Sequence, residues 1–571
     1  MIPVALDDCM AWLHPAAKDT ACGRAVVLVP ALGFEELCTR RSLRVLADRL
    51  ALAGLATLRF DFHGTADSLG DETAPDRIVR WRADAHRAVD RLRQLTGAAE
   101  IALIGLRFGA LIAADVAAGR DDIAMLGLMA PPASGRLYAR ETAALSRIIA
   151  PQPDDGQGGV AVAGFRLAAQ TVEAVKRLDW PVAAPCPHLM VVAQGQAAHG
   201  LADRLAAPDT ALRRLSFAGY ERMICDPTAS EVPFAVLDDV VAWARERAPI
   251  APAAVPAPAT AGVLAAEAFV EEGVTFGPGG RLAGILCRPT AATGQVVIFT
   301  NSGGVPHIGW ARMTVRFARA LAARGIGSLR MDFAGLGDSR AVAEAPTPFY
   351  YDRATLADIT AAVDCVIAQG FGEITVSGNC SGAHHAFHAA LADTRIHALA
   401  LSNLECFVWG PRYQLPLGAW LAALPVSVEL KKRTADETLS ETARWQAWLK
   451  DRTVTLARRY AKPTVGALQR LAARLVPQGR PDSGGNAIAA GFNALSARGV
   501  RVRLVYSEGD AGLGELELYM GPDGGDATRL PGIDRHIIDG ADHPMTTPGA
   551  QAAMLSMIID MLGHKASVRA A

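Results

Sequence analysis

A long internal repeat constrains this chain more than any other feature of its sequence. The stretch LRFDFHGTADS near residue 60 returns near residue 330 as LRMDFAGLGDS. At one constant offset, Arg59, Asp61, Gly64, Asp67 and Ser68 correspond to Arg330, Asp332, Gly335, Asp338 and Ser339. A repeat of this length and order predicts two copies of one fold.

The segments on either side of the repeated motif also correspond. Upstream, AVVLVPALGF and QVVIFTNSGG are apolar runs of strand type, and an amphipathic helix pattern follows each. Downstream, EIALIGLRFGALIAADVAAG and EITVSGNCSGAHHAFHAALA each join a strand pattern to a helix pattern through a Gly-x-x-x-Gly turn. Alternating strands and helices predict, in each copy, a mainly parallel sheet flanked by helices.

The chain of 571 residues is long enough for two full hydrophobic cores. A Pro/Ala-rich stretch lies between the two copies and is typical of a semi-rigid linker. We therefore expect a first domain at 1–247, a linker at 248–263 and a second domain at 264–571. The tryptophan-containing segment at about 406–485 is expected to form a helical cap over the second domain.

Composition argues against several classes of protein. The formal net charge of −1 gives no global attraction to nucleic acid or to an anionic membrane. No signal-peptide pattern opens the sequence, and no run reaches the roughly 18 to 20 apolar residues of a membrane helix. Nine cysteines without paired spacing argue against a disulfide framework and structural zinc. We expect a cytoplasmic protein that uses no metal and no cofactor.

The second copy contains a candidate nucleophile at Cys380. The sequence Gly378-Asn379-Cys380-Ser381-Gly382 joins a strand pattern to a helix pattern, which is the setting of a G-x-nucleophile-x-G turn. The positive end of the following helix would favour the thiolate of Cys380. The alternative is a buried cysteine beside a structural turn.

An acid and a histidine follow Cys380 in the chain order of a nucleophile, acid and histidine triad. Asp510 comes after the strand pattern VRVRLVYSEGD, and His543 comes after the last strand pattern, in IIDGADH. Asp510 would orient the imidazole, and His543 would take and return the proton of Cys380. Glu508 remains an alternative acid.

Stabilisation of a tetrahedral oxyanion needs two backbone N–H donors. We expect one from Ser381 and the other from Ser302 or Gly303, in the loop after the first central strand of the second copy. The glycines of that loop also suit a plain turn. Histidines follow the nucleophile turn, but no third ligand is evident for a metal, so packing is their expected role; they are His384, His385 and His388.

The first copy has lost all three candidate groups. Arg107, Gln196 and Arg222 stand where the second copy has Cys380, Asp510 and His543. Arginine stays protonated in proteins and serves neither as nucleophile nor as base. Either the first copy is a catalytically silent scaffold or partner surface, or Arg107 and Arg222 clamp a carboxylate or phosphate, with His63 and Tyr220 in the same hollow.

These motifs resemble the α/β hydrolases associated with exosortase A systems. The first copy, with GLRFGA and GRLYARE, is similar to the second type of these proteins, and the second copy, with GNC and GADH, to the first type. The resemblance covers most of both cores and implies two tandem α/β-hydrolase domains, whereas the two types are separate proteins in that family. The turn is also similar to those of dienelactone hydrolases and polyhydroxyalkanoate synthases, which implies acyl chemistry on cysteine.

The sequence thus predicts a cysteine hydrolase that cleaves a small-molecule ester or thioester through an acyl-Cys380 intermediate. One alternative is an acyltransferase that passes the acyl group to an alcohol or amine, with an acyl carrier protein as a donor partner. A further alternative is a non-enzymatic binding or assembly protein, since this fold hosts many activities.

Overall fold

The computed structural model describes residues 1–17, 19–150, 158–194, 196–246, 248, 262–342, 354–409 and 484–563. Most of the expected cap and nearly all of the expected linker lie outside these residues. By their contacts the residues form two compact units, and each is described by itself. The first comprises Met1–Arg147, Pro151–Pro348 and Ala361–Gly372, and the second comprises Ile148–Ala150, Phe349–Thr360 and Glu373–Ala571.

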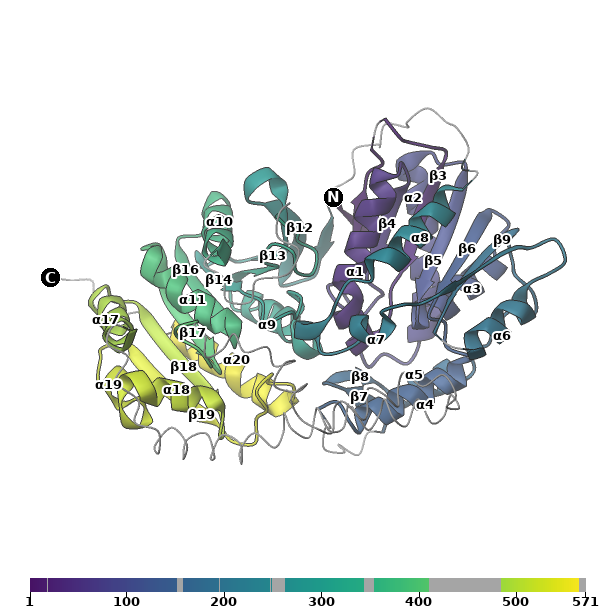
Figure 1. Cartoon of the computed structure of the whole chain (residues 1–571). Helices are drawn as coiled ribbons and strands as arrows, with labels where there is room; N and C mark the ends of the chain where they lie inside the picture. Colours follow the sequence, from purple (N-terminus) through teal and green to yellow (C-terminus); the bar gives the residue numbers. More distant parts are fainter. Residues whose placement is uncertain are drawn as a thin grey trace. The chain divides into compact units, whose positions relative to one another are not determined.

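The strands of the first copy form an eight-stranded sheet in the first unit (Figure 1), in the order β1-β2-β4-β3-β5-β6-β9-β10. Their bounds are β1 Ile2–Leu6, β2 Cys9–His14, β3 Arg24–Val29, β4 Ala56–Phe60, β5 Glu100–Leu106, β6 Ile123–Met129, β9 His188–Ala193 and β10 Ala211–Ser216. Only the β1–β2 and β2–β4 pairs are antiparallel, and the others are parallel. This confirms the predicted mainly parallel sheet.

Helices cover both faces of this sheet. Alternate residues of β3 enter different cores, because successive side chains of a strand point to opposite faces. Val27 packs in the core that includes α2 and α3, whereas Val26 and Leu28 pack in the core that includes α1 and α8. The helices are α1 Gly33–Leu52, α2 Arg77–Thr96, α3 Phe108–Ala118, α4 Gly135–Ser146, α5 Ala169–Lys176, α6 Gln196–Leu205, α7 Tyr220–Met223 and α8 Phe234–Arg245.

A small lid stands between β6 and β9 in the first copy. It contains α4, α5 and a two-stranded antiparallel sheet made of β7 (Val160–Val162) and β8 (Phe165–Leu167). The helix α4 contacts both α5 and β7. The first copy therefore has its own lid, which the sequence did not predict.

The second copy contributes strands to both units. In the first unit the order is β11-β12-β13-β15-β14, with bounds Val263–Ala265, Phe269–Phe276, Leu282–Pro289, Gly327–Met331 and Gln295–Phe299 respectively. In the second unit the order is β16-β17-β18-β19, all parallel, with bounds Glu373–Asn379, Ile396–Ser402, Arg501–Ser507 and Ile533–Ile538. The boundary between the units falls within the second copy, so the division at 247 and 264 stays a prediction.

Helices of the second copy alternate with these strands, as predicted. They are α9 Met313–Ala322, α10 Ala354–Ala368, α11 Ser381–Ala392, α17 Gly484–Ala497, α18 Ala511–Met520, α19 Gly525–Thr528 and α20 Pro548–Gly563. Among the helices described, none combines the length and the hydropathy needed to cross a bilayer.

The two copies of the repeated motif adopt the same loop within the first unit. In one copy the Ser68 hydroxyl donates to the Asp61 carbonyl over 2.7 Å, and in the other Ser339 donates to the Asp332 carbonyl over 2.6 Å. The main-chain N–H of Asp67 donates to the Asp61 carboxylate, as that of Asp338 does to the Asp332 carboxylate. The repeat is thus a repeat of geometry as well as of sequence.

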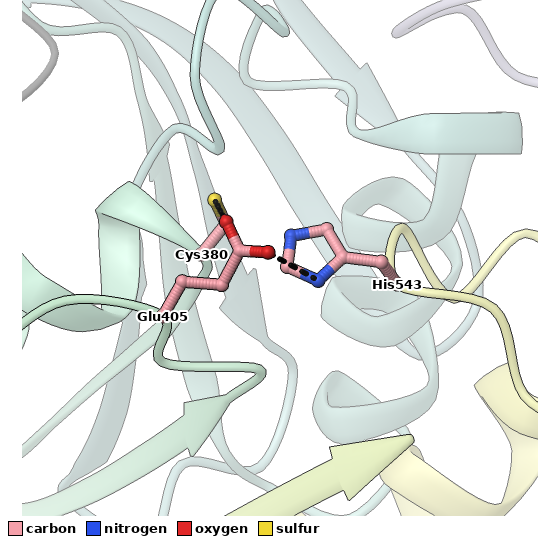
Figure 2. A group of neighbouring side chains, drawn as sticks. All are labelled: Cys380, Glu405 and His543. Carbon is pink, nitrogen blue, oxygen red and sulfur yellow. Dashed lines mark hydrogen bonds and ion pairs between the residues drawn. The ribbon is translucent and has the colours of Figure 1, made fainter. Parts of the chain in front are cut away.

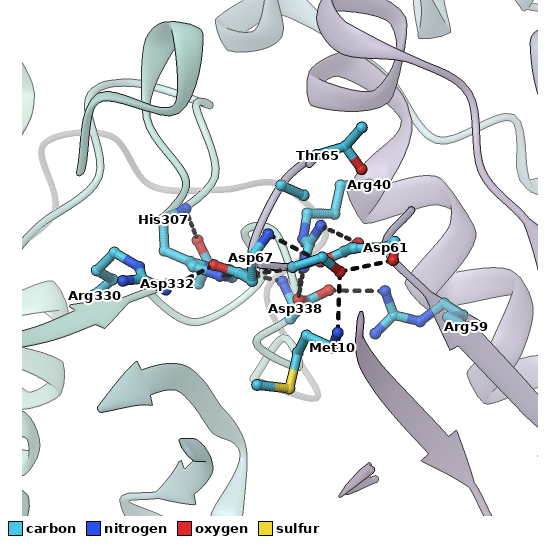
Figure 3. A network of polar contacts seen from close by, with 12 residues as sticks. Met10, Arg40, Arg59, Asp61, Thr65, Asp67, His307, Arg330, Asp332 and Asp338 are labelled. Carbon is cyan, nitrogen blue, oxygen red and sulfur yellow. Dashed lines mark hydrogen bonds and ion pairs between the residues drawn. The ribbon is translucent and has the colours of Figure 1, made fainter. Parts of the chain in front are cut away.

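The two loops exchange ion pairs reciprocally (Figure 3). Arg59 of the first copy donates to Asp338 of the second over 2.8 Å, and Arg330 of the second copy donates to Asp67 of the first over 3.0 Å. Arg59 corresponds to Arg330 and Asp67 to Asp338, so equivalent residues meet in the manner of a two-fold symmetric dimer. This exchange is intramolecular.

Two cations complete the exchange. The guanidinium of Arg40 binds its own copy's Asp61 over 2.9 Å and the other copy's Asp338 over 3.0 Å. The imidazole of His307 binds its own copy's Asp332 and the other copy's Asp67, both over 2.7 Å. Burial lowers the pKa of His307, but the two aspartates outweigh it and raise the pKa to about 10. His307 is therefore charged at neutral pH.

Candidate active site

Cys380 occupies the sharp turn between β16 and α11 in the second unit. Its backbone has φ 55° and ψ −118°, a conformation that costs a non-glycine residue about 1–3 kcal/mol. The Cys380 N–H donates to the Ser402 carbonyl at the end of the neighbouring strand over 3.0 Å, which holds the turn in place. The predicted turn is present, and the thiol is half-buried.

The turn needs glycine two residues before and two residues after its central residue, and the contacts in the first copy show why. There, a Cβ on Gly105 would lie 2.3 Å from the Gly109 carbonyl oxygen, and a Cβ on Gly109 would lie 2.4 Å from the Pro30 carbonyl oxygen. Both positions therefore require glycine, because backbone passes where a side chain would begin.

His543 and Asp510 lie together, as the sequence predicted. The Asp510 side chain caps α18 by accepting from the Gly512 N–H over 2.9 Å, and its other oxygen lies 2.6 Å from Nδ1 of His543. With Nδ1 facing the carboxylate, Nε2 is the nitrogen left for a reacting group. A ring nitrogen of His543 and Sγ of Cys380 lie within 4.8 Å of one another.

The alternative acid Glu508 and the neighbouring Asp542 have other partners. The carboxylate of Glu508 accepts from the Gly540 N–H over 3.3 Å. The carboxylate of Asp542 accepts from the backbone N–H and the hydroxyl of Thr546, over 2.7 and 2.6 Å. Asp510 is therefore the acid best placed to orient His543.

A network of amide side chains fixes the loop that bears His543. The Asn403 amide donates to the His543 carbonyl over 2.7 Å and to the Ser507 hydroxyl over 2.9 Å. The Ser507 hydroxyl in turn donates to the Asp542 carbonyl over 2.9 Å. The histidine loop is thus fastened to the carboxyl ends of β17 and β18.

Glu405 is a residue of this site that sequence reasoning missed. One of its oxygens lies 3.7 Å from Nδ1 of His543 and the other 3.9 Å from Sγ of Cys380 (Figure 2). The sulfur, a carboxylate oxygen and an imidazole nitrogen all lie within 4.8 Å of one another. The sequence could have indicated Glu405 only as a single acid in LSNLECF, just beyond the carboxyl end of a strand. Functional sites of parallel sheets lie at this end of the strands.

The histidines after Cys380 hold the segment that bears Glu405. His384 binds the Cys406 carbonyl and His388 binds the Phe407 carbonyl, each over 2.7 Å. His385 instead binds the Thr355 hydroxyl over 2.7 Å. These contacts fit the packing role that the sequence suggested.

The electrostatics of the site favour a charged imidazole. Burial lowers the pKa of His543, but the Glu405 carboxylate, Cys380 and the hydrogen bond to Asp510 together raise it well above its ordinary value. Two carboxylates therefore stabilise the imidazolium beside the thiol.

The residues predicted for the oxyanion hole lie in different units. Ser381 is the first residue of α11, next to Cys380, whereas Ser302 and Gly303 follow β14 in the first unit. The glycines of that loop face Thr228 and Pro227, and a Cβ on Gly304 would lie 2.1 Å from the Pro227 carbonyl oxygen. Close packing thus explains Gly304, and the oxyanion roles stay a prediction.

The first copy has a different arrangement at the same turn. Arg107 has φ 53° and ψ −118°, and its guanidinium binds Glu35 over 2.8 Å and Glu141 over 2.6 Å. It also faces the rings of Tyr138 and Tyr220. Arg107 is therefore already neutralised by two internal carboxylates.

Arg107 and Arg222, which one of the two interpretations joined in an anion clamp, have different surroundings. The Arg222 side chain is 70% exposed, and its nearest carboxylate is that of Glu231 at 3.4 Å. His63 lies near Arg80 rather than Arg107. Gln196 opens α6, and its side chain is outside the described part of the structure. The guanidinium of Arg107 instead forms ion pairs with Glu35 and Glu141, which the alignment of the two copies did not suggest as partners.

Comparisons with known proteins agree with this architecture. Residues 23–152 match the family model described as serine aminopeptidase, S33, and residues 297–553 match the model of the alpha/beta hydrolase family. No curated protein matches the chain. The two matches fall on the two copies of the repeat.

Solved structures with similar folds include several hydrolases. Est1E from Butyrivibrio proteoclasticus, with ferulic acid bound, is 20% identical over 43% of this chain and 99% of its own, with a TM-score of 0.34. The esterase Pf2001 from Pyrococcus furiosus is 12% identical over 52% of this chain and 92% of its own, with a TM-score of 0.32. Mouse alpha/beta hydrolase domain-containing protein 10 is 16% identical over 51% and 98%, with a TM-score of 0.29.

Proposed function

The two matched regions place the chain in the α/β-hydrolase superfamily as a tandem arrangement, and on that premise we propose that its second copy is a cysteine hydrolase. It would cleave an ester or a thioester through an acyl-Cys380 intermediate. The observation that carries the proposal is the group of side chains at one strained turn: Sγ of Cys380 lies within 4.8 Å of a ring nitrogen of His543, whose Nδ1 lies 2.6 Å from Asp510.

Acylation begins when Sγ of Cys380, its proton transferred to Nε2 of His543, attacks the substrate carbonyl carbon. The S–C bond forms, and the carbonyl electron pair moves to oxygen, where the N–H of Ser381 would stabilise it. Return of that pair expels the alcohol or thiol, which takes a proton from Nε2 of His543. The products of this half-reaction are the acyl-enzyme and the free leaving group.

Deacylation uses the same groups in reverse. Nε2 of His543 accepts a proton from a water molecule, and the water oxygen attacks the thioester carbon. Collapse of the second tetrahedral intermediate releases the carboxylic acid and restores Cys380 with His543 in its starting pair. Asp510 keeps the imidazole oriented throughout.

The raised pKa of His543 suits a thiol better than an alcohol as nucleophile. A protonated His543 can stabilise negative charge that develops on the sulfur of Cys380, and α11 begins with its positive end at the same residue. A serine in this place would need a neutral imidazole to remove its proton. The electrostatics thus support a cysteine enzyme.

Intact-mass analysis after brief exposure to p-nitrophenyl butyrate and to butyryl-N-acetylcysteamine tests the proposal. We expect one butyryl adduct on the wild-type chain, none on Cys380→Ala, and one on Cys365→Ala, a matched half-buried cysteine elsewhere. Decay of the adduct at the same rate with and without added alcohols or amines indicates a hydrolase, and acceleration by them indicates an acyltransferase. An adduct that persists in Cys380→Ala would rule the mechanism out.

A further inference from the structure

The first copy keeps a pocket beneath its lid although its turn carries Arg107. The pocket lies in the first unit and has about 660 Å³ of empty space, including its open mouth. The lid side is mainly apolar, with Leu145, Val162, Phe165 and Leu167.

The acidic side chains that line this pocket are all paired with arginines. Glu35 binds Arg107 and Glu36 binds Arg40, each over 2.8 Å. Glu72 binds Arg316 over 3.0 Å. Each of the three carboxylates thus already has an ion-pair partner, and that of Glu72 acts on Arg77 and Arg312 only through space.

Two arginines in the pocket wall lack such a partner. Arg77 and Arg312 are 3% and 6% exposed, and both donate to the carbonyl oxygen of Gly64, over 3.2 and 3.0 Å. Arg77 also donates to the Glu72 carbonyl, and Arg312 to the carbonyls of Ala66 and Ser68. Among the described residues, neither guanidinium forms an ion pair with a carboxylate.

The unbalanced charge calls for a counter-ion. Nε of Arg77 is buried and has no acceptor among the described residues. Burial lowers the pKa of Arg77 to about 10 and that of Arg312 to about 9. A buried cation without an anion is costly, and a planar guanidinium binds carboxylate and phosphate oxygens well.

We propose that this pocket binds a small anion, a carboxylate or phosphate on a short apolar body, without converting it. Arg77 and Arg312 would hold the anionic head, and the apolar lid residues would cover the body. The first copy would thus be a ligand-binding domain of the molecule. The proposal does not depend on the chemistry proposed for Cys380.

Calorimetric titration of the full chain tests the site, with Cys380 first alkylated by iodoacetamide so that the second copy cannot react. The probes are hexanoate, hexyl phosphate, hexanol and hexylamine, in a buffer free of carboxylate and phosphate. We expect at least one of the two anions to bind, and hexanol and hexylamine to bind at least tenfold more weakly.

Three variants separate the pocket from general charge effects. Arg77→Met should weaken binding of the anion at least tenfold. Arg80→Met is the matched control, because Arg80 lies on the same helix but is exposed and paired with Asp76, and it should bind as the wild type does. Thr142→Phe places a ring in the pocket and leaves both arginines intact, and it should abolish binding.

Absence of binding by both anions would overturn the proposal, as would equal binding of hexanol. An affinity unchanged by Thr142→Phe would do the same even where Arg77→Met proved unstable. Binding of an anion by the wild type and by Arg80→Met, together with the expected losses in Arg77→Met and Thr142→Phe, would establish the site.

Discussion

Cys380 and Arg107 share one strained backbone conformation, with φ 55° and 53° and ψ −118° at both residues. One copy places a thiol beside a histidine on this turn, and the other places a guanidinium between two glutamates. The fold therefore enforces the turn in both copies, whatever side chain stands on it. The strain is retained in the first copy without a nucleophile to present.

Asp510→Asn should lower kcat between about 10² and 10⁴ fold, because an amide cannot stabilise the imidazolium or fix its tautomer. Glu508→Gln is the control, since Glu508 binds a loop N–H instead of the imidazole, and it should stay within about twofold of wild type. Rates of acyl release from p-nitrophenyl butyrate measure both. Equal losses in the two variants would contradict the assignment of Asp510.

Cys380 should react with iodoacetamide before the buried thiols do. Burial raises the pKa of Cys9 far above its usual range, that of Cys186 to about 11 and that of Cys287 to about 12. Since the thiolate is the reactive form, these three remain inert in the folded protein. Peptide mapping after partial alkylation at pH 7 reports the order, and labelling of Cys287 ahead of Cys380 would contradict it.

Arg107→Ala should destabilise the chain by about 3–5 kcal/mol, because Glu35 and Glu141 would lose their common buried partner. Arg222→Ala is the matched arginine control, being 70% exposed, and should change stability by less than about 0.5 kcal/mol. Urea unfolding measures the free energy of unfolding of both variants, and we expect its dependence on urea concentration to be unchanged. A small effect of Arg107→Ala would show that its ion pairs contribute little.

The parts of the fold that depend on local pattern could be predicted from the sequence. The repeat, the strand–turn–helix around Cys380 and the order of Asp510 and His543 each depend on neighbouring residues. Glu405 was missed because its role arises where the ends of β16, β17 and the His543 loop meet, which is a tertiary arrangement. For the same reason the contacts of Arg107 with Glu35 and Glu141 could not be predicted.

Glu405→Gln should lower the pKa of His543, since the Glu405 charge is the largest influence that raises it. The imidazolium would then lose its proton at lower pH than in the wild type. Histidine-selective NMR titration shows the shift directly, and the pH dependence of kcat/KM should move in the same direction. An unchanged titration in Glu405→Gln would mean that Asp510 alone sets the pKa.

His307 should make stability fall at alkaline pH. Its pKa is raised from 6.5 to about 10, so its contribution is fully present below pH 6.5 and is lost as the pH rises through about 10. His307→Gln should cost about 3 kcal/mol at pH 7 and lose much of this alkaline dependence. Thermal unfolding from pH 7 to 10.5 compares the two proteins, and parallel curves would contradict the assignment.

The exchanged ion pairs join residues that are far apart in the sequence. The counter-ion of Arg59 is encoded 279 positions downstream, and that of Arg330 is encoded 263 positions upstream. Substitution of one of these residues therefore leaves its partner in the other copy without its counter-ion. Removal of either copy would leave a buried arginine and a buried aspartate of the remaining copy without their counter-ions.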